Sequence, residues 1–474
     1  MSQLPLSIGR IHFTGIGGIG MSGIAEILHD MGYQVSGSDM SSNANVKRLI
    51  SKGIPITIGQ HEDNVTGAAI IVVSTAIKPD NPEMVAARKS FLPIVHRAEM
   101  LGELMRLKWS VAIAGTHGKT TTTSLVASLL DMGGIDPTVI NGGIITGWGS
   151  NAKLGNSEWM VVEADESDGS FSRLNPTVAV VTNIDPEHLD HHGSFDNLKQ
   201  AFRDFISSIP FYGFASLCID HPIVQRMIAD IPERRIISYG FSASADVRGV
   251  NLRSENGTMI FDTVISNRLS NDGTIEGFRL PMLGDHNVLN TLAAISVCLE
   301  MGIDTDKVIN AVSQFKGVGR RFDHKGCVSD ITIIDDYGHH PVEITAALSA
   351  ARMLRPSNQI IAVFQPHRYT RMRDLFDDFC ACFNDADHVI ISDIYAAGED
   401  PIDGYERDDF VNSLRAHGHP SVEALDHPDA LAKQVMTKAR QGDVIMCLGA
   451  GTITNWAAAL PNQIAAITGD EVQS

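Results

Sequence analysis

Two glycine-rich loops, each set between a short apolar strand and a helix, constrain the fold of this chain most strongly. The first is Gly15-Ile16-Gly17-Gly18-Ile19-Gly20, and the second is Gly115-Thr116-His117-Gly118-Lys119-Thr120-Thr121. Glycine lets the backbone approach a phosphate closely, and the phosphate then rests at the N-terminus of the next helix. Because such loops form at the carboxyl edge of open parallel sheets, the chain is predicted to be an α/β protein with two phosphate-binding sites.

The alternation of apolar and helical segments predicts three α/β domains in series. Residues 1–107 have the pattern of a Rossmann-like domain. Residues 108–315 have that of a P-loop ATPase-type domain with a mostly parallel sheet, interrupted by a polar, strand-like insertion at 238–283. A glycine-rich linker at 316–321 begins a Rossmann-like C-terminal domain, 316–474. The expected strands are 11–14, 35–38, 70–74, 109–114, 159–163, 177–182, 331–335, 359–364, 388–392 and 443–448.

Composition excludes several classes of function. The 474 residues carry 37 Lys and Arg against 56 Asp and Glu, and the net charge of −19 opposes binding to nucleic acid. No sequence segment approaches the roughly 18 consecutive apolar residues of a membrane span, and residues 1–10 lack the apolar core of a secretory signal. The six cysteines form no CxxC pair, which favours reduced thiols. We therefore expect a cytoplasmic protein without membrane insertion. A monomer or weak homodimer is expected as well, although no sequence feature fixes the oligomeric state.

The first loop has the context of a diphosphate-binding site. Gly15, Gly17 and Gly20 fit G-x-G-x-x-G after a strand, and a helix expected at 21–31 follows. The next strand leads to Asp39, where this fold places an acid at its ligand site. The pattern indicates a pyrophosphate but leaves the rest of the ligand open, because NAD and a nucleotide-diphosphate sugar satisfy the same requirements.

The second loop resembles a P-loop with altered spacing. Ile113 stands where G-x-x-x-x-G-K-[ST] has its first glycine, and Gly115 comes two residues later. The run of Lys119 and four threonines at a helix start, behind a buried strand, still predicts phosphate binding. Backbone amides would hold the phosphates, Lys119 would offset charge at the β and γ positions, and the Thr120 hydroxyl would bind Mg²⁺.

Acidic and imidazole side chains follow two further strands at the same expected sheet edge. Glu163 ends the strand at 159–163, and His188 lies in the polar run after 177–182. Mg²⁺ beside ATP takes one or two carboxylates, so Glu163 is a candidate ligand, and His188 is a candidate for a second divalent ion. The sequence has no H-E-x-x-H, which excludes a zinc-protease site.

Longer motifs resemble the Mur ligases of peptidoglycan synthesis over nearly the whole chain and in the family's order. They are His-Phe-Thr-Gly-Ile-Gly-Gly-Ile-Gly-Met-Ser-Gly at 12–23, Gly-Thr-His-Gly-Lys-Thr-Thr-Thr at 115–122, Glu-Ala-Asp-Glu-Ser-Asp at 163–168, Thr-Asn-Ile-Asp-Pro-Glu-His-Leu-Asp at 182–190, Gly-Asp-His-Asn-Val-Leu-Asn at 284–290, Asp-Asp-Tyr-Gly-His-His-Pro at 335–341 and Gln-Pro-His-Arg-Tyr-Thr-Arg at 365–371. The resemblance implies a UDP-substrate domain, an ATPase domain and a C-terminal domain that admits an amino acid. It further implies an ATP-dependent ligase that joins L-alanine to the carboxylate of UDP-N-acetylmuramate, with Mg²⁺ or Mn²⁺.

The resemblance also implies roles for individual residues. In place of NAD, the UDP diphosphate would be bound by Gly15, Gly17, Gly18, Gly20, Asp39 and Ser74. The ATP site would include Gly115, Thr116, His117, Gly118, Lys119, Thr120, Thr121, His286, Asn287, Asn290, Arg321 and Asp336, and the metal site Thr120, Glu163 and His188. The amino-acid side would be lined by Tyr337, His339, Arg368 and Arg371. The catalytic candidates are Lys119, His188 and His339.

One position departs from most of the family. Several members carry a lysine, modified to a carbamate, about fourteen residues after the metal histidine. This chain has Phe202 there, and the nearby Lys199 is out of register. No carbamylated ligand is therefore expected, which fits the branch of the family that adds L-alanine.

The implied reaction has two steps, and it has rivals. Attack of the muramyl carboxylate on the γ-phosphate of ATP gives an acyl phosphate and ADP, and the amine of L-alanine then displaces phosphate. A sister ligase that attaches a recycled tripeptide would share nearly every motif, although Met21-Ser22-Gly23 after the first loop favours the L-alanine enzyme. An NAD-dependent oxidoreductase would leave the second loop unused. A nucleotide-binding regulatory protein would leave Glu163 and His188 unexplained.

Overall fold

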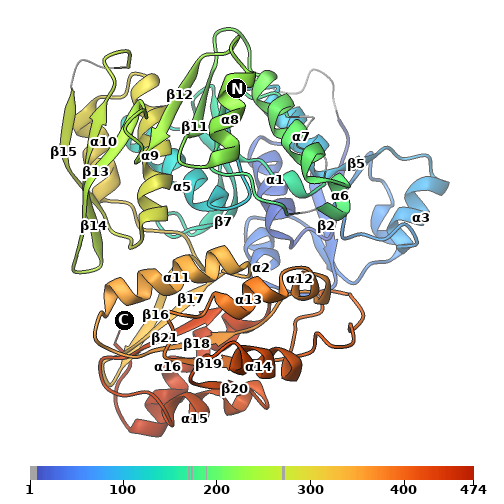
Figure 1. Cartoon of the computed structure of the whole chain (residues 1–474). Coiled ribbons are helices and arrows are strands. Elements are labelled where there is room, and N and C mark those ends of the chain that lie inside the picture. Colours follow the sequence, from blue (N-terminus) through green and yellow to red (C-terminus); the bar gives the residue numbers. More distant parts are fainter. Residues whose placement is uncertain (1–7, 169–170, 172–173, 188, 270–272, 474) are drawn as a thin grey trace. The chain divides into compact units, whose positions relative to one another are not determined.

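The computed structural model describes residues 8–168, 171, 174–187, 189–269 and 273–473 (Figure 1). The chain divides into two compact units. The first comprises Met1–Asn251, Phe261–Arg279 and Val288–Lys316, and the second comprises Leu252–Ile260, Leu280–Asn287 and Gly317–Ser474. The strands of the three sheets are mostly parallel and alternate with helices along the chain, which confirms the predicted α/β fold class. The three domain boundaries expected from the sequence stay a prediction.

The first sheet has five parallel strands in the order β3-β2-β1-β4-β5. Its strands are β1 (Ile11–Thr14), β2 (Val35–Asp39), β3 (Ile56–Ile58), β4 (Ile70–Val73) and β5 (Ile94–His96). Its helices are α1 (Ile19–Asp30), α2 (Ala44–Ser51), α3 (Pro82–Lys89) and α4 (Arg97–Met105). The three strands predicted here are confirmed to within one residue, whereas the helix predicted at 21–31 begins two residues earlier.

A buried carboxylate, Glu83, ties together the carboxyl ends of β1 and β2. Its Oε2 accepts hydrogen bonds from Thr14 Oγ1 at 2.6 Å and Ser38 Oγ at 2.8 Å, and lies 3.3 Å from His12 Nε2. Its Oε1 accepts a hydrogen bond from Asn64 Nδ2 at 2.6 Å. Burial would raise the pKa of Glu83, but His12 and the three donors outweigh it, so the pKa is lowered. Glu83 is therefore an ionised carboxylate with partners on both oxygens, next to the end of β1, after which the first loop begins.

We expect Glu83→Gln to lower the free energy of unfolding by about 2 kcal/mol at pH 7, because a buried network then loses its charged acceptor. A carboxylate with a lowered folded pKa adds stability above its ordinary value of 4.5 and loses it as pH falls through the folded value. The difference between wild type and variant should therefore shrink at low pH. Urea unfolding at pH 7 and pH 4 measures it, with the exposed Glu62→Gln as control. Equal unfolding midpoints at pH 7 would contradict this role.

The second sheet has ten strands in the order β15-β14-β13-β12-β11-β10-β6-β9-β7-β8. They are β6 (Trp109–Ala114), β7 (Thr138–Ile145), β8 (Ser150–Lys153), β9 (Trp159–Glu163), β10 (Val178–Val181), β11 (Phe214–Cys218), β12 (Ile236–Gly240), β13 (Val247–Glu255), β14 (Thr258–Ile265) and β15 (Thr274–Leu280). β6 lies between β9 and β10 and runs parallel to both, so the carboxyl ends of these three strands meet at one edge. The strands predicted at 109–114 and 159–163 are confirmed, and the one predicted at 177–182 is one residue shorter at each end. The insertion expected to be strand-like contains β13, β14 and β15.

Helices of this part of the chain include α5 (Lys119–Gly133), α6 (Leu189–His192), α7 (Phe195–Ser207), α8 (Pro222–Asp230), α9 (Asp285–Glu300), α10 (Thr305–Ser313) and the short 3-10 turn η2 (Glu166–Asp168). Four apolar residues of α5 are buried: Leu125, Val126, Leu129 and Leu130. α5 therefore packs its apolar side inward while its first turn stays at the carboxyl edge of the sheet, directly after β6.

The third sheet lies in the second unit and has the order β16-β17-β21-β18-β19-β20. Its strands are β16 (Asp323–Val328), β17 (Ile331–Asp336), β18 (Ile360–Phe364), β19 (His388–Ile391), β20 (Val422–Ala424) and β21 (Val444–Leu448), of which only β16 pairs antiparallel. Alternate strand residues face two cores. One core is covered by α11 (Pro341–Leu354), α13 (Phe376–Ala381) and α14 (Arg407–Ala416), and the other by α15 (Leu431–Met436) and α16 (Ile453–Thr468).

All six cysteines are free thiols, and five of them are buried. None of the helices that the structure describes is long and apolar enough to cross a membrane.

Candidate functional site

The second glycine loop joins β6 to α5 and needs glycine at two positions. Gly115 has φ +136°, and a Cβ there would overlap Thr182 Oγ1. Gly118 has φ +82°, and a Cβ there would lie 2.6 Å from Asn290 Oδ1. Ile113 is a buried residue of β6, so the loop starts at Gly115, which explains the altered P-loop spacing.

Lys119, at the first position of α5, is held inside this loop. Its Nζ donates to the carbonyl oxygens of Gly115 at 2.6 Å and Thr116 at 3.1 Å, and lies 2.8 Å from Glu166 Oε1. Burial opposes its charge, but Glu166, Asp165 and Glu163 outweigh the burial and raise the pKa of Lys119. Lys119 is therefore a positive charge fixed where the loop carbonyls and the end of β9 meet.

Glu166 is the partner that sequence reasoning missed, although it stands only three residues after Glu163. Its side chain is 1% exposed, and its Oε2 has no hydrogen-bond partner among the residues that the structure describes. Burial raises the pKa of Glu166 to about 7, against the opposing effect of Lys119. A buried acid with an unsatisfied oxygen, next to a fixed lysine, is typical of a ligand site rather than of a structural ion pair.

Two of the three predicted metal ligands lie on adjacent elements of the sheet edge. Glu163 ends β9 directly beside Ile113 of β6, and its Oε2 accepts a hydrogen bond from the Gly142 amide at 2.9 Å. Thr120 lies in the first turn of α5, 6% exposed, and Thr121 is buried beside it. Carboxylate and hydroxyl oxygens suit Mg²⁺. His188, the third candidate, lies outside the described residues.

The segment that follows β10 forms hydrogen bonds with the second loop that the sequence did not predict. The amide of His117 donates to Asn183 Oδ1 at 2.7 Å, and the amide of Asp185 donates to Thr116 Oγ1 at 2.8 Å. The carboxylate of Asp185 lies 3.6 Å from His117 Nε2 and 3.3 Å from His221 Nε2. Asn183, Asp185 and His221 thus hold the loop from the side of β10 and β11.

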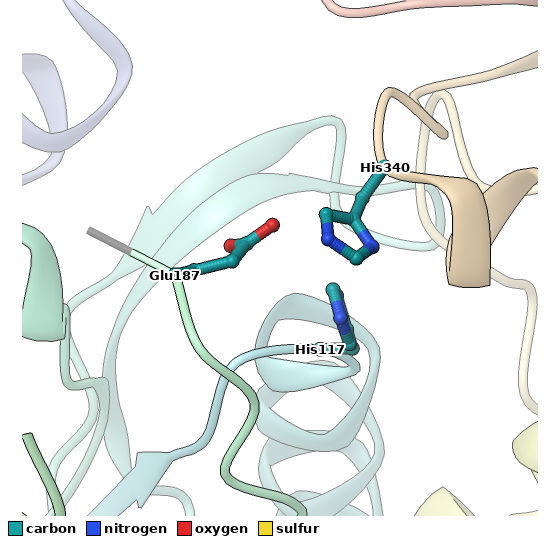
Figure 2. Close-up of side chains that lie close together, drawn as sticks. All are labelled: His117, Glu187 and His340. Atoms are coloured by element: carbon teal, nitrogen blue, oxygen red, sulfur yellow. The ribbon is translucent and has the colours of Figure 1, made fainter. Parts of the chain in front are cut away.

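Figure 2 shows His117 on the loop before α5 and Glu187 on the segment after β10, both in the first unit. A ring nitrogen of His117 and a carboxylate oxygen of Glu187 lie within 4.8 Å of each other. Figure 2 also labels His340, which is the N-cap residue of α11 in the second unit. His117 was a predicted loop residue, whereas Glu187 and His340 received no role from the sequence.

The predicted adenosine-side residues all lie at the start of α9. Asn290 accepts a hydrogen bond from Thr122 Oγ1 of α5 at 3.1 Å, which places it beside the second loop. Asn287 and His286 belong to the second unit, where Asn287 Nδ2 donates to the carbonyl of Leu283 at 2.7 Å and His286 is exposed. The structure thus brings Asn290 to the loop and leaves the placement of the other two a prediction.

The first loop is held by the residues that follow β2. The amide of Gly17 donates to Asp39 Oδ2 at 2.8 Å, and its carbonyl accepts from Asn43 Nδ2 at 3.2 Å and Asn45 Nδ2 at 3.0 Å. Asp39 therefore fixes the loop backbone in this structure, and Asn43 and Asn45 were missed. The other predicted residues follow β1 or β4. Gly15 has φ +77°, Gly18 is the N-cap of α1, Gly20 lies in the first turn of α1, and Ser74 comes directly after β4.

In the second unit, the predicted residues Arg321, Asp336 and Tyr337 gather at the end of β17. Two guanidinium groups lie over the Tyr337 ring, with the Cζ atom of Arg320 4.7 Å and that of Arg321 5.0 Å from the ring centre. Asp336 accepts hydrogen bonds from the amides of Phe322 and Gly338, each at 2.7 Å. Burial raises the pKa of Asp336 to about 6, although Arg321 opposes it. Arg320 was missed by sequence reasoning.

The other predicted amino-acid-side residues lie next to this group. His339 Nδ1 is 3.0 Å from the Tyr337 carbonyl, and its ring centre is 6.0 Å from that of His367. Arg371 Nη1 lies 3.2 Å from His367 Nδ1. Burial lowers the pKa of His339 to about 3, so its imidazole is neutral at pH 7. Arg368, the N-cap of α12 (Tyr369–Asp374), has the strained φ of +71°. His367 is a further residue without a predicted role.

The position expected for a carbamylated lysine is part of the core. Phe202 in α7 is fully buried and packs against the ring of Phe171 at 4.9 Å between ring centres. Lys199 forms an ion pair with Asp196 at 2.6 Å on the same helix.

Three family models match successive parts of the chain. They are described as Mur ligase family, catalytic domain, at residues 10–109; Mur ligase middle domain, at 113–298; and Mur ligase, glutamate ligase domain, at 320–451. The chain is 57% identical to UDP-N-acetylmuramate–L-alanine ligase of Rhodospirillum rubrum over 100% of this chain and 98% of that protein. It is 58% identical to the enzyme of the same name from Acidiphilium cryptum over 98% of each chain.

Solved structures agree with these matches. The crystal structure of UDP-N-acetylmuramate-alanine ligase from Thermotoga maritima superposes with a TM-score of 0.83 at 27% identity, covering 97% of this chain and 100% of that chain. A murein peptide ligase from Psychrobacter arcticus, with a TM-score of 0.73, 23% identity and coverage of 96% and 98%, shares the fold. With the family models matched over most of its length, this chain belongs to the Mur ligase family.

Proposed function

We propose that this protein is an ATP-dependent ligase that joins L-alanine to the carboxylate of UDP-N-acetylmuramate in the synthesis of peptidoglycan precursors. The observation that carries the proposal is Lys119, fixed at the start of α5 within a glycine loop and surrounded by carboxylates. The name carried by relatives 57–58% identical over nearly the full chain supplies the substrates. The oxidoreductase alternative gives Lys119 no role, and the regulatory alternative gives Glu163 none.

The chemistry requires a good leaving group, because a carboxylate alone is a poor acyl donor. Transfer of the γ-phosphate of ATP to the muramyl carboxylate gives an acyl phosphate, whose phosphate the amine of L-alanine then displaces. Catalysis of phosphoryl transfer is mostly positioning and charge stabilisation. In this proposal Lys119 exchanges Glu166 and the loop carbonyls for the β and γ phosphates. Glu166, with its pKa raised to about 7 by burial, can take up a proton when Lys119 leaves it.

The oxygen donors at the sheet edge fit a hard divalent cation. We propose that Thr120, Glu163 and His188 hold Mg²⁺, or Mn²⁺ in its place. The Gly142 amide aims the Glu163 carboxylate toward this edge. A bound cation would neutralise charge on the transferred phosphoryl group.

The remaining sites follow the three domains proposed above, 1–107, 108–315 and 316–474. Gly15, Gly17, Gly18, Gly20, Asp39 and Ser74 would bind the UDP diphosphate. The second loop, with His286, Asn287, Asn290, Arg321 and Asp336, would bind ATP, and Tyr337, His339, Arg368 and Arg371 would admit L-alanine. His188 or His339 would be the base for the amine, although the low pKa of His339 makes it a weak one.

The test is release of phosphate from ATP and UDP-N-acetylmuramate with different acceptors. We expect L-alanine to raise phosphate release at least a hundredfold over the rate without acceptor, and the tripeptide of the sister ligase to have no effect. NADH should not bind, as measured by its fluorescence. Release that depends on the tripeptide and not on L-alanine would assign the chain to the sister activity. The free thiols favour action in the cytoplasm, and a monomer or weak homodimer stays a prediction.

A further inference from the structure

Arg97, which no motif singled out, lies against the first turn of the helix that follows the first glycine loop. It is the first residue of α4, directly after β5. A Cβ added at Gly20 would lie 3.0 Å from Arg97 Nη1 and 3.1 Å from Arg97 Cδ. Gly20 thus leaves room for the arginine side chain, so the guanidinium group passes over the N-terminal turn of α1.

The same guanidinium group also contacts the acidic segment that follows β9. Arg97 Nη2 lies 3.2 Å from Asp165 Oδ2, and Asp165 stands between Glu163 and Glu166 after β9. The charge of Lys119 also acts on Asp165. Asp165 is therefore the acid that both cations share, and Arg97 reaches from the first loop to the acidic segment beside the second.

The acidic segment after β9 carries more negative charge than Lys119 alone can offset, so a second cation is needed there. Lys119 faces three carboxylates, those of Glu163, Asp165 and Glu166. A triphosphate and a sugar acid bring further negative charge to the same place, and two anions must come within reacting distance there. An arginine offers five N–H donors in a planar fork, so it can bind a substrate carboxylate with paired hydrogen bonds while its charge offsets the repulsion.

We propose that Arg97 binds the muramyl carboxylate of UDP-N-acetylmuramate and orients it toward the γ-phosphate of ATP. This inference rests on the proposed function. In the step that it serves, a carboxylate oxygen forms a bond to the γ-phosphorus while the bond from that phosphorus to the bridging oxygen breaks, and the electron pair leaves with ADP. Arg97 keeps its proton throughout and is a binding residue for the nucleophile.

The test compares substrate with an analogue that lacks the reacting group. UDP-N-acetylglucosamine has the diphosphate but no muramyl carboxylate. We expect Arg97→Met to raise the KM for UDP-N-acetylmuramate at least tenfold, while the inhibition constant of UDP-N-acetylglucosamine and the KM for ATP stay within twofold of wild type. Arg97→Lys should show a smaller rise, because the charge remains and the fork is lost. Arg106→Met, at the other end of α4 with an exposed partner in Glu103, is the matched control.

Three results would overturn the inference. The first is an unchanged KM for UDP-N-acetylmuramate in Arg97→Met. The second is equal weakening of both UDP sugars, which would assign Arg97 to the diphosphate or to the fold. The third is a wild-type KM for UDP-N-acetylmuramate in Arg97→Lys, which is the deciding measurement if Arg97→Met does not fold. Failure of the proposed function looks different, because the wild-type protein would then release no phosphate in response to L-alanine.

Discussion

Replacement of Lys119 by methionine is expected to lower kcat for alanine-dependent phosphate release about 10³-fold. The variant removes the charge that the proposal places on the β and γ phosphates and keeps the length of the side chain. The first loop lies in a different sheet, so the dissociation constant of UDP-N-acetylmuramate should stay within about threefold of wild type. Steady-state phosphate release measures the first quantity, and calorimetric titration without ATP measures the second.

Removal of Lys119 leaves its buried partner Glu166 without a counter-charge, so this experiment needs a control for stability. Lys119 lowers the pKa of Glu166, which burial raises, so its removal should leave Glu166 protonated and neutral at pH 7. The variant should therefore fold, and Lys119→Met with Glu166→Gln should unfold at the same temperature as Lys119→Met alone. Lys153→Met is the matched control, because Lys153 lies in β8 of the same sheet and pairs with Asp131 of α5 and with Asp136. Turnover of wild-type size in Lys119→Met would remove the ATP-loop assignment.

The parts of the fold that the sequence predicted are those with strong local signals. Short apolar runs placed β1, β6 and β9 correctly, and the glycine spacing located both loops. The helix after the first loop was predicted to begin at residue 21, whereas α1 begins at Ile19. Helix starts that lack a side-chain cap leave little signal in the sequence, and Gly18, the N-cap of α1, provides none.

The contacts that complete the candidate site depend on strand order, which chain order does not reveal. β6 lies between β9 and β10, so Glu166 and Asn183 reach the loop from opposite sides although 47 and 66 residues separate them from their partners Lys119 and His117. The same reason applies to Arg97, whose approach to Gly20 crosses from the end of β5 to the end of β1. A single sequence predicts which functional side chains follow each strand, but the strand order in the sheet decides which strand ends lie side by side.

Replacement of Glu163 by glutamine is expected to lower kcat about 10²-fold and to raise the Mg²⁺ concentration for half-maximal activity at least tenfold. The amide keeps the size of the side chain but loses the negative charge that a divalent cation requires of its ligand. Titration of phosphate release with Mg²⁺, at saturating ATP and UDP-N-acetylmuramate, measures both quantities. The metal role fails if the Mg²⁺ dependence of Glu163→Gln equals that of wild type.

A second variant, Gly142→Ala, tests the position of the Glu163 carboxylate by changing its backbone neighbour. The Gly142 amide donates to Glu163 Oε2 at 2.9 Å, and a Cβ at Gly142 would overlap the carboxyl group. The φ of Gly142 lies outside the left-handed region, so alanine is tolerated by the backbone there and acts mainly by displacing Glu163. We expect Gly142→Ala to raise the Mg²⁺ requirement severalfold, less than Glu163→Gln does, with unfolding unchanged. Gly147→Ala, whose added Cβ would meet only the Lys316 side chain at 3.7 Å or more, should behave as wild type. A Mg²⁺ requirement that shifts equally in both glycine variants would show that strand β7 and its turn, rather than the position of the Glu163 carboxylate, cause the effect.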